Sequence, residues 1–64
     1  MPLVQVDGPI LTDVEQKRKL ARLLTQAAAE GYGMSEEHII VLIRENSPEN
    51  VASGGQLVAD RHQR

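Results

Sequence analysis

The 64-residue sequence has no cysteine, phenylalanine or tryptophan, and Tyr32 is its one aromatic residue. Without cysteine the chain has neither disulfides nor thiolate chemistry. Its net charge of −2 and single aromatic side chain disfavour a nucleic-acid-binding surface. No apolar run approaches the roughly 18 residues of a membrane span, and residues 1–7 lack the pattern of a signal peptide. We therefore expect a soluble, cytoplasmic protein that does not bind nucleic acid or membranes.

The length sets a second limit. A chain of this size forms one domain at most, and it buries only about 60% of the surface that its unfolded state exposes. Domains this small are usually supported by disulfides, a metal or partner subunits. The two histidines, His38 and His62, show no metal-ligand spacing, so neither a metal nor a cofactor is expected. We predict a single domain over residues 1–64 that is stabilised by self-association.

The first half of the chain predicts a strand followed by a helix. Residues 2–7 alternate in polarity and predict a strand, which Gly8-Pro9 should end. The segment 12–15 fits a capping box, in which the Thr12 hydroxyl accepts a hydrogen bond from the Glu15 amide. Apolar residues at helical spacing then predict an amphipathic helix over about residues 13–31. Its solvated face should carry the basic residues Lys17, Arg18, Lys19 and Arg22.

The second predicted strand, residues 38–45, is apolar on both faces, because residues 39–43 form an uninterrupted apolar run. A right-handed crossover through the helix makes the two strands parallel and covers one face of the pair. The other face is equally apolar and also needs a cover. Since the chain has no second helix to provide one, we expect another copy of the protein there, and hence a homo-oligomer.

The C-terminal segment is short and polar. Gly54-Gly55 predicts a tight hairpin, and the tail of residues 60–64 is expected to be partly disordered. Together, these patterns predict an α+β fold that consists of a single β-α-β unit with a small C-terminal hairpin.

Several short motifs stand in a familiar order along essentially the whole chain. They are Met1-Pro2 before a strand, Glu15-Gln16-Lys17 at the helix start, Ile40–Glu45, Ser47–Val51, Gly54-Gly55 and Ala59-Asp60-Arg61. In these motifs the chain resembles the 4-oxalocrotonate tautomerase family, most closely its short DmpI-like branch. The resemblance implies a β-α-β fold assembled as a trimer of dimers (a hexamer) or a related oligomer.

The same resemblance implies that Met1 is removed and that Pro2 becomes the catalytic general base. A free amino-terminal proline carries a secondary amine, and α-amino groups ordinarily titrate near about 8. A partly buried site with cations nearby lowers such a pKa towards the working pH of a general base. The amine would move a proton between the positions of a dienol without a metal or an organic cofactor. With Met1 retained, the nitrogen is a tertiary amide and has no basic character.

The sequence departs from the prototype of the family at four positions. Two arginines that bind the prototype's dicarboxylate substrate are replaced by Thr12 and Ile40, and a large aromatic residue is replaced by Val51. Where the prototype uses a backbone amide near the end of the first-strand loop, Pro9 has no N–H to offer. A carboxylate substrate still requires cations or hydrogen-bond donors. Arg44, on the same strand face as Ile40, and Arg61 in the tail are the candidate substrate-binding residues.

Each candidate also has a simpler interpretation. Arg44 can be an edge cation that pairs with Glu45 or with another subunit's acid, and Arg61 can be a solvated tail charge. Neither His38 nor His62 is a persuasive acid or base. Three functions stay open. The first is a keto–enol tautomerase acting on small 2-hydroxydienoic or 2-oxo acids, with hydration or decarboxylation as variants. The second is a non-catalytic binding or assembly member of the same fold. The third, which is disfavoured, is a nucleic-acid-binding oligomer.

Overall fold

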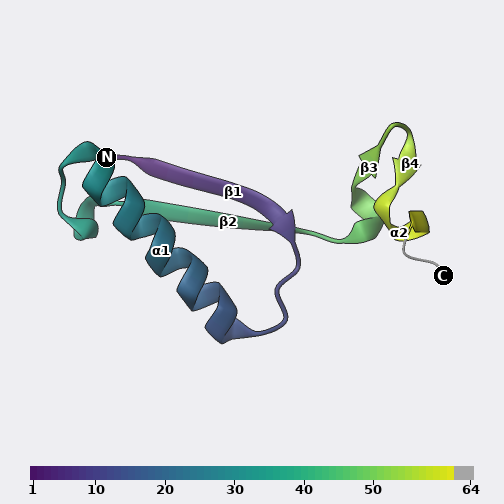
Figure 1. Ribbon diagram of the computed structural model, residues 1–64, viewed down its shortest axis with the longest axis horizontal. Coiled ribbons are helices and arrows are strands. Elements are labelled where there is room, and N and C mark those ends of the chain that lie inside the picture. Colours follow the sequence, from purple (N-terminus) through teal and green to yellow (C-terminus); the bar gives the residue numbers. More distant parts are fainter. Residues whose placement is uncertain (62–64) are drawn as a thin grey trace.

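A computed structural model describes residues 1–61 and shows a β-α-β unit followed by a small C-terminal arm (Figure 1). The unit consists of β1 (Leu3–Pro9), α1 (Val14–Tyr32), the 3-10 turn η1 (Glu36–His38) and β2 (Ile40–Asn46). The arm consists of the 3-10 turn η2 (Pro48–Asn50), β3 (Ala52–Ser53), β4 (Gln56–Leu57) and α2 (Val58–Arg61). Strands β1 and β2 are parallel, and this confirms the predicted β-α-β unit with its terminal hairpin.

The two faces of the β1–β2 pair differ in burial. The register pairs Leu3 with Ile40 and Asp7 with Arg44. The half-buried residues on the α1 side are Val4, Val6, Val41 and Ile43. On the opposite side, Leu3, Ile40 and Leu42 keep 57%, 45% and 45% of their surface exposed. We call this second side the open face, and its apolar residues have no cover within residues 1–61.

Both ends of α1 carry specific caps. At the start, Asp13 is extended and its Oδ1 accepts a hydrogen bond from the Glu15 amide at 3.0 Å. The predicted Thr12 cap is therefore wrong. The helix begins one residue later, and the Asp13 carboxylate suits the positive end of the helix dipole better than a hydroxyl. At the other end Gly33 adopts φ +66°, and the Met34 amide donates to the Ala29 carbonyl at 2.9 Å, which completes a Schellman motif.

The strand boundaries differ from the prediction. β1 continues through Gly8 to Pro9 rather than ending before them. The Ile40 amide donates to the Pro2 carbonyl, so the polar backbone groups of even-numbered β1 residues point to β2. The missing N–H of Pro9 therefore falls on the outer edge, where it costs no ladder bond. β2 begins at Ile40, two residues later than predicted, because η1 takes up the preceding residues.

The C-terminal arm extends beyond the carboxyl ends of β1 and β2, away from α1 (Figure 1). Gly54 and Gly55 have φ of +62° and +83°, as a type I′ turn requires, and this confirms the predicted hairpin. Of the tail that was expected to be partly disordered, Asp60 and Arg61 belong to α2. The rest of that tail, residues 62–64 with His62, lies outside the described residues.

The interior of the described chain is small. Ala29, at 8% exposure, is the one residue of 1–61 that falls into the buried class. Neither of the α-helices in this range is long and apolar enough to cross a membrane. The apolar residues of the open face and of α1 thus leave much of their hydrophobic surface in water, which is unusual for a stable isolated domain.

Candidate active site

Pro2 lies half-buried immediately before β1, where the sheet fixes its backbone. Its carbonyl accepts a hydrogen bond from the Ile40 amide at 3.1 Å, at the start of the ladder between the two strands. Because parallel strands begin at the same end of a sheet, Pro2 lies beside the connection between α1 and β2 (Figure 1). The position of the proline is therefore set by the backbone of β2.

A hollow of about 420 Å³ lies at this end of the sheet. It is lined by Met1, Met34, Ser35 and His38. Met1 is 88% exposed, and while it is present the Pro2 nitrogen is part of a peptide bond. The sequence pattern alone did not select Ser35 or His38, because they precede the second strand and match no motif. The parallel pairing is the signal that places them beside the amino terminus.

Arg44 lies on the open face, at the far end of the strand pair. Its partner across the ladder is Asp7, five residues from Pro2, which corresponds to about 17 Å of strand. Arg44 Nε donates to Asp7 Oδ1 at 3.0 Å, and with the Gln5 amide oxygen turned towards it, that oxygen also accepts from the guanidinium. The expected pairing with Glu45 is wrong, since adjacent strand residues point to opposite faces. The charge of Arg44 is thus already compensated within its own chain.

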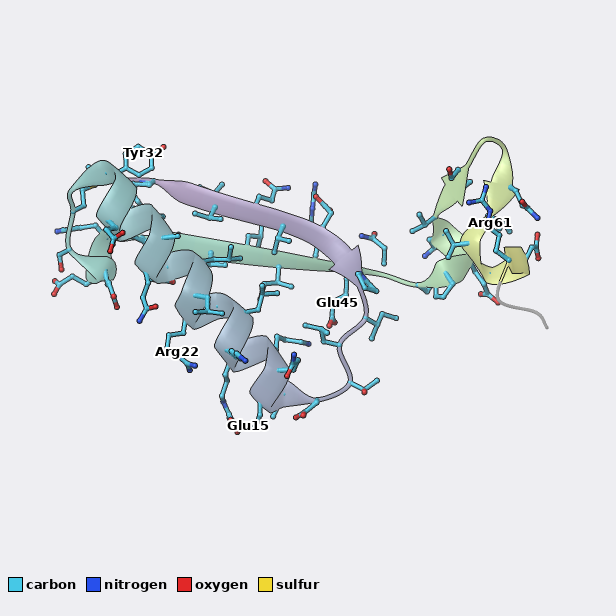
Figure 2. The ribbon with its side chains drawn as sticks, in the orientation of Figure 1. Glu15, Arg22, Tyr32, Glu45 and Arg61 are labelled. Atoms are coloured by element: carbon cyan, nitrogen blue, oxygen red, sulfur yellow. The ribbon has the colours of Figure 1, made fainter. Side chains whose placement is uncertain are left out.

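Glu45 instead joins three segments on the α1 side of the sheet (Figure 2). Its Oε2 accepts from the Leu11 amide at 2.8 Å and lies 2.9 Å from Lys17 Nζ. The sequence had placed Lys17 on the solvated face of the helix. In the structure it instead forms an ion pair with Glu45. The Leu11 amide first, and then the Lys17 ammonium group, hold the pKa of the Glu45 carboxyl below its ordinary value, although partial burial opposes this.

Arg61 binds to its own hairpin. Its Nε donates to Gln56 Oε1 at 3.1 Å and its Nη2 donates to the Ser53 carbonyl at 2.9 Å. Figure 2 shows Arg61 in the arm, at the opposite end of the molecule from β1's first residue. A single chain therefore brings neither Arg44 nor Arg61 to Pro2, and their predicted role in substrate binding stays a prediction.

A second hollow, of about 460 Å³, separates the end of the sheet from the arm. It is mostly apolar and is lined by Asp7, Gly8, Pro9, Asn46, Pro48, Val51 and Val58. Val51, at the position of the prototype's aromatic residue, thus faces a space far from the Pro2 of its own chain. Within residues 1–61 no three His, Asp or Glu side chains gather in a way that would hold a metal ion.

Fold and site together define a small β-α-β protein with a proline fixed at the head of the first of two parallel strands. Residues 2–61 match the family model described as tautomerase enzyme. The chain therefore belongs to the tautomerase family. The match begins at Pro2.

Individual relatives agree with this assignment over nearly their whole length. A probable tautomerase from Bacillus cereus is 43% identical over 61 residues, which cover 95% of this chain and 100% of that protein. The crystal structure of DmpI from Archaeoglobus fulgidus superposes with a TM-score of 0.85 at 49% identity, covering 92% and 100% of the two chains. A heterohexamer 4-oxalocrotonate tautomerase from Chloroflexus aurantiacus J-10-fl gives 0.86 at 30% identity, covering 100% of both. The predicted family, fold and enzyme class, an isomerase of the tautomerase type, are confirmed.

Proposed function

We propose that the chain, after removal of Met1, is a cofactor-independent keto–enol tautomerase for small 2-hydroxydienoic or 2-oxo acids, with Pro2 as its general base. The observation that carries this proposal is the placement of Pro2. The family match starts at this residue, and the Ile40 amide ties its carbonyl to the sheet. The reaction is expected in the cytoplasm.

The proposed chemistry uses the lone pair of the prolyl nitrogen. Loss of Met1 converts a tertiary amide into a secondary amine, while the carbonyl bond to Ile40 is unaffected. The amine takes the proton of a 2-hydroxyl group, the O–H electron pair forms the carbonyl, and the π electrons move to a distal carbon. That carbon then takes the proton back from the prolyl ammonium. The proline ring restricts the backbone at this residue, so the nitrogen stays oriented through both transfers.

We further propose that the chain acts as a homo-oligomer, with a hexamer as the expected form. The support is the exposed apolar residues of the open face, Leu3, Ile40 and Leu42, and the single buried residue of the described chain. Arg44 and Arg61 lie far from the Pro2 of their own chain, so a role in substrate binding requires that they come from neighbouring subunits. The hexameric relative makes such an arrangement a reasonable model.

The test starts from the state of the amino terminus. Intact mass spectrometry shows whether Met1 is removed, and the processed protein is then assayed by ultraviolet absorbance with 2-hydroxymuconate and phenylenolpyruvate. Two variants are compared with it. Pro2→Ala replaces the secondary amine by a primary amine, and insertion of an alanine between Met1 and Pro2 keeps the proline but leaves its nitrogen acylated after processing.

We expect both variants to lose about 10²- to 10⁴-fold in kcat, the usual contribution of a general base. The circular dichroism spectrum and the number of chains per assembly should not change, because β1 and its hydrogen bonds to β2 are intact in both variants. Equal rates for the wild type and the insertion variant would exclude the Pro2 nitrogen as the base for these substrates.

The alternative is a non-catalytic member that binds small acids or serves in assembly. The observation in its favour is the compensation of Arg44 by Asp7, together with Thr12 and Ile40 in place of the prototype's arginines. This alternative predicts a processed protein that binds a 2-oxo acid but does not exchange its enolisable protons with deuterium, which proton NMR of the ligand would measure directly.

A further inference from the structure

We propose that Ser35 and His38 bind the substrate's carboxylate beside Pro2, within the same chain. In the prototype this carboxylate-binding role belongs to two arginines, which are replaced here by Thr12 and Ile40. The inference rests on the proposed function, since it concerns the substrate of the Pro2 site. It differs from the earlier expectation by assigning the charge recognition to a histidine that no sequence motif marks.

Topology brings these residues to the proline. β1 and β2 run parallel and start at the same end, so the residues before β2 lie next to the residues before β1. Ser35, His38, Met34 and Met1 line one hollow. Met1 belongs to that wall, so its removal opens the hollow on the side where the Pro2 amine becomes the amino terminus. The proposed base and the proposed anion site then adjoin without help from another subunit.

The turn η1 connects Ser35 to His38. Ser35 precedes the turn in extended backbone, His38 ends it, and the His38 amide donates to the Ser35 carbonyl at 3.1 Å. Both residues line the same hollow, which brings the Ser35 hydroxyl and the His38 imidazole to one site. Each can donate a hydrogen bond to a carboxylate oxygen, and a protonated imidazole adds a positive charge.

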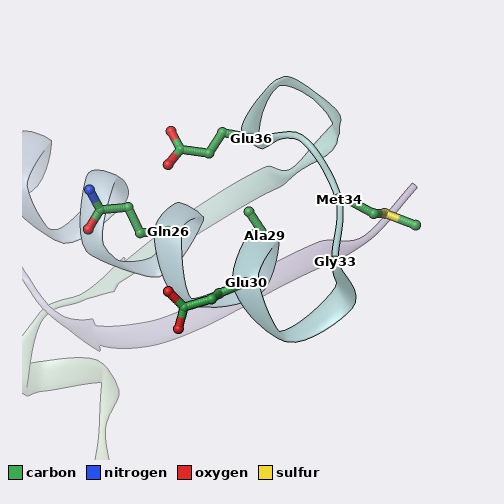
Figure 3. Close-up of a pocket in the computed structure, with 6 residues that line it drawn as sticks. All are labelled: Gln26, Ala29, Glu30, Gly33, Met34 and Glu36. Carbon is green, nitrogen blue, oxygen red and sulfur yellow. The ribbon is translucent and has the colours of Figure 1, made fainter.

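The acidic residues of this region lie mostly on another side. Figure 3 shows Glu36 extending towards Gln26, while Met34 points away from them. Glu30 and Glu36 line that separate hollow, and no carboxylate lines the space beside Met1. Glu37, the remaining charged residue of η1, lines neither of the two. Once Met1 is removed, His38 is the one lining residue of this hollow whose side chain can carry a positive charge.

This lining defines a class of substrate. One cation and one hydroxyl suit a single carboxylate, and the Met34 side chain, 44% exposed, offers apolar surface to a short carbon chain. We therefore infer a preference for 2-oxo or 2-hydroxyenoic monocarboxylates over dicarboxylates. A dicarboxylate would need a second cation, which the residues of this hollow do not include.

Calorimetry with an unreactive probe tests the binding apart from the chemistry. Phenylglyoxylate is a 2-oxo monocarboxylate that has no α-hydrogen and cannot enolise, and its methyl ester is the neutral match. The processed wild type is compared with His38→Gln, His38→Lys, Ser35→Ala and Glu37→Gln, the last of these as a charge control in the same turn.

We expect His38→Gln to weaken binding of the acid about tenfold, the usual value of one charge-assisted hydrogen bond at a partly open site. Binding of the ester should not change. Ser35→Ala should weaken acid binding by a smaller factor, His38→Lys should restore most of it, and Glu37→Gln should leave it within about twofold of wild type. The circular dichroism spectrum and the number of chains per assembly should be the same for all five proteins.

The proposal is overturned if the wild type binds the acid no better than the ester, or if His38→Gln binds both as the wild type does. The proposed function of Pro2 is tested separately. Pro2→Ala should keep the affinity for phenylglyoxylate while losing turnover of phenylenolpyruvate. A wild type with His38-dependent binding but no turnover would refute the Pro2 chemistry alone.

Discussion

The amide of Ile40 donates a hydrogen bond to the carbonyl of Pro2, at 3.1 Å. This bond joins the residue that precedes β1 to the first residue of β2, and it involves backbone atoms alone. The geometry at the amino terminus therefore depends on the backbone of the sheet. Substitutions at residue 2 are expected to change the chemistry of the nitrogen and to leave its position nearly unchanged.

A charge on the open face should prevent self-association. Leu42→Asp places a carboxylate among the exposed apolar residues of the open face, where burial against another chain would desolvate it. We expect light scattering after size exclusion to give the monomer mass at micromolar concentration. The matched control is Val14→Asp, which adds the same charge at a residue that is 55% exposed in the first turn of α1. A Leu42→Asp protein with the wild-type mass would show that the open face is not the contact.

Arg44→Gln tests whether this guanidinium contributes to a neighbouring subunit's site. If it does, KM for an acidic substrate should rise about tenfold while kcat changes little, because uniform binding is lost. Asp7→Asn is the complementary change. It frees Arg44 from its 3.0 Å partner and should lower the same KM. Unchanged kinetics in both variants would restrict Arg44 to its exposed ion pair, which contributes about 0.2–1 kcal/mol to stability.

Glu45 should make stability depend on pH. Its pKa in the folded protein is lowered from 4.5, so the folded state releases this proton more readily than the unfolded chain. The contribution to stability is therefore complete above the ordinary pKa and is lost as the pH falls through the lowered value. We expect Glu45→Gln to reduce the thermal midpoint at pH 7, and the difference from wild type to shrink below about pH 4.5.

Glu15→Gln is the control for this experiment. Glu15 pairs with Arg18 on the exposed side of α1, where such pairs contribute only about 0.3–0.5 kcal/mol. Its midpoint should stay close to that of wild type at every pH. A constant difference between Glu45→Gln and wild type from pH 3 to pH 7 would contradict the ionic role of Glu45.

The start of α1 provides a prediction about stability alone. Asp13→Ala should lower the free energy of unfolding by about 1 kcal/mol, since it leaves the Glu15 amide without an acceptor. Thr12→Ala, one residue earlier, should change it by less than about 0.5 kcal/mol. Urea titrations at fixed protein concentration compare the two. The reverse order would restore Thr12 as the cap.

Local patterns predicted most of the fold. The apolar run of residues 39–43, the helical spacing from Leu20 to Ala28 and the Gly54-Gly55 pair each identified their element, because burial and turn chemistry are encoded nearby in sequence. The errors occurred at boundaries. Whether Thr12 or Asp13 caps the helix depends on which of them is the last extended residue before it. Whether a proline ends a strand depends on the direction of its missing hydrogen bond, which becomes known only with the register of the strands.

The site was less accessible to sequence reasoning than the fold. Pro2 was selected by resemblance, and the structure shows how the sheet holds it. Of the alternatives for Arg44, a pair with Glu45 was wrong. Arg44 binds Asp7, and Glu45 binds Leu11 and Lys17, all of which lie in other segments. His38 was passed over because only the parallel pairing reveals its proximity to the amino terminus. A single sequence does not reveal contacts between distant segments, including any between subunits.

Among residues 1–61, Ala29 alone is almost fully buried, and this has a thermodynamic consequence. Unfolding an isolated chain would hydrate less hydrocarbon than unfolding a well-packed domain of the same size, so its own heat-capacity increment would be below the usual value. Any larger increment seen in calorimetry then comes from contacts between chains, and the melting temperature should fall on dilution by mass action. With the proposed assembly, a melting curve would report the separation of chains together with the loss of their secondary structure.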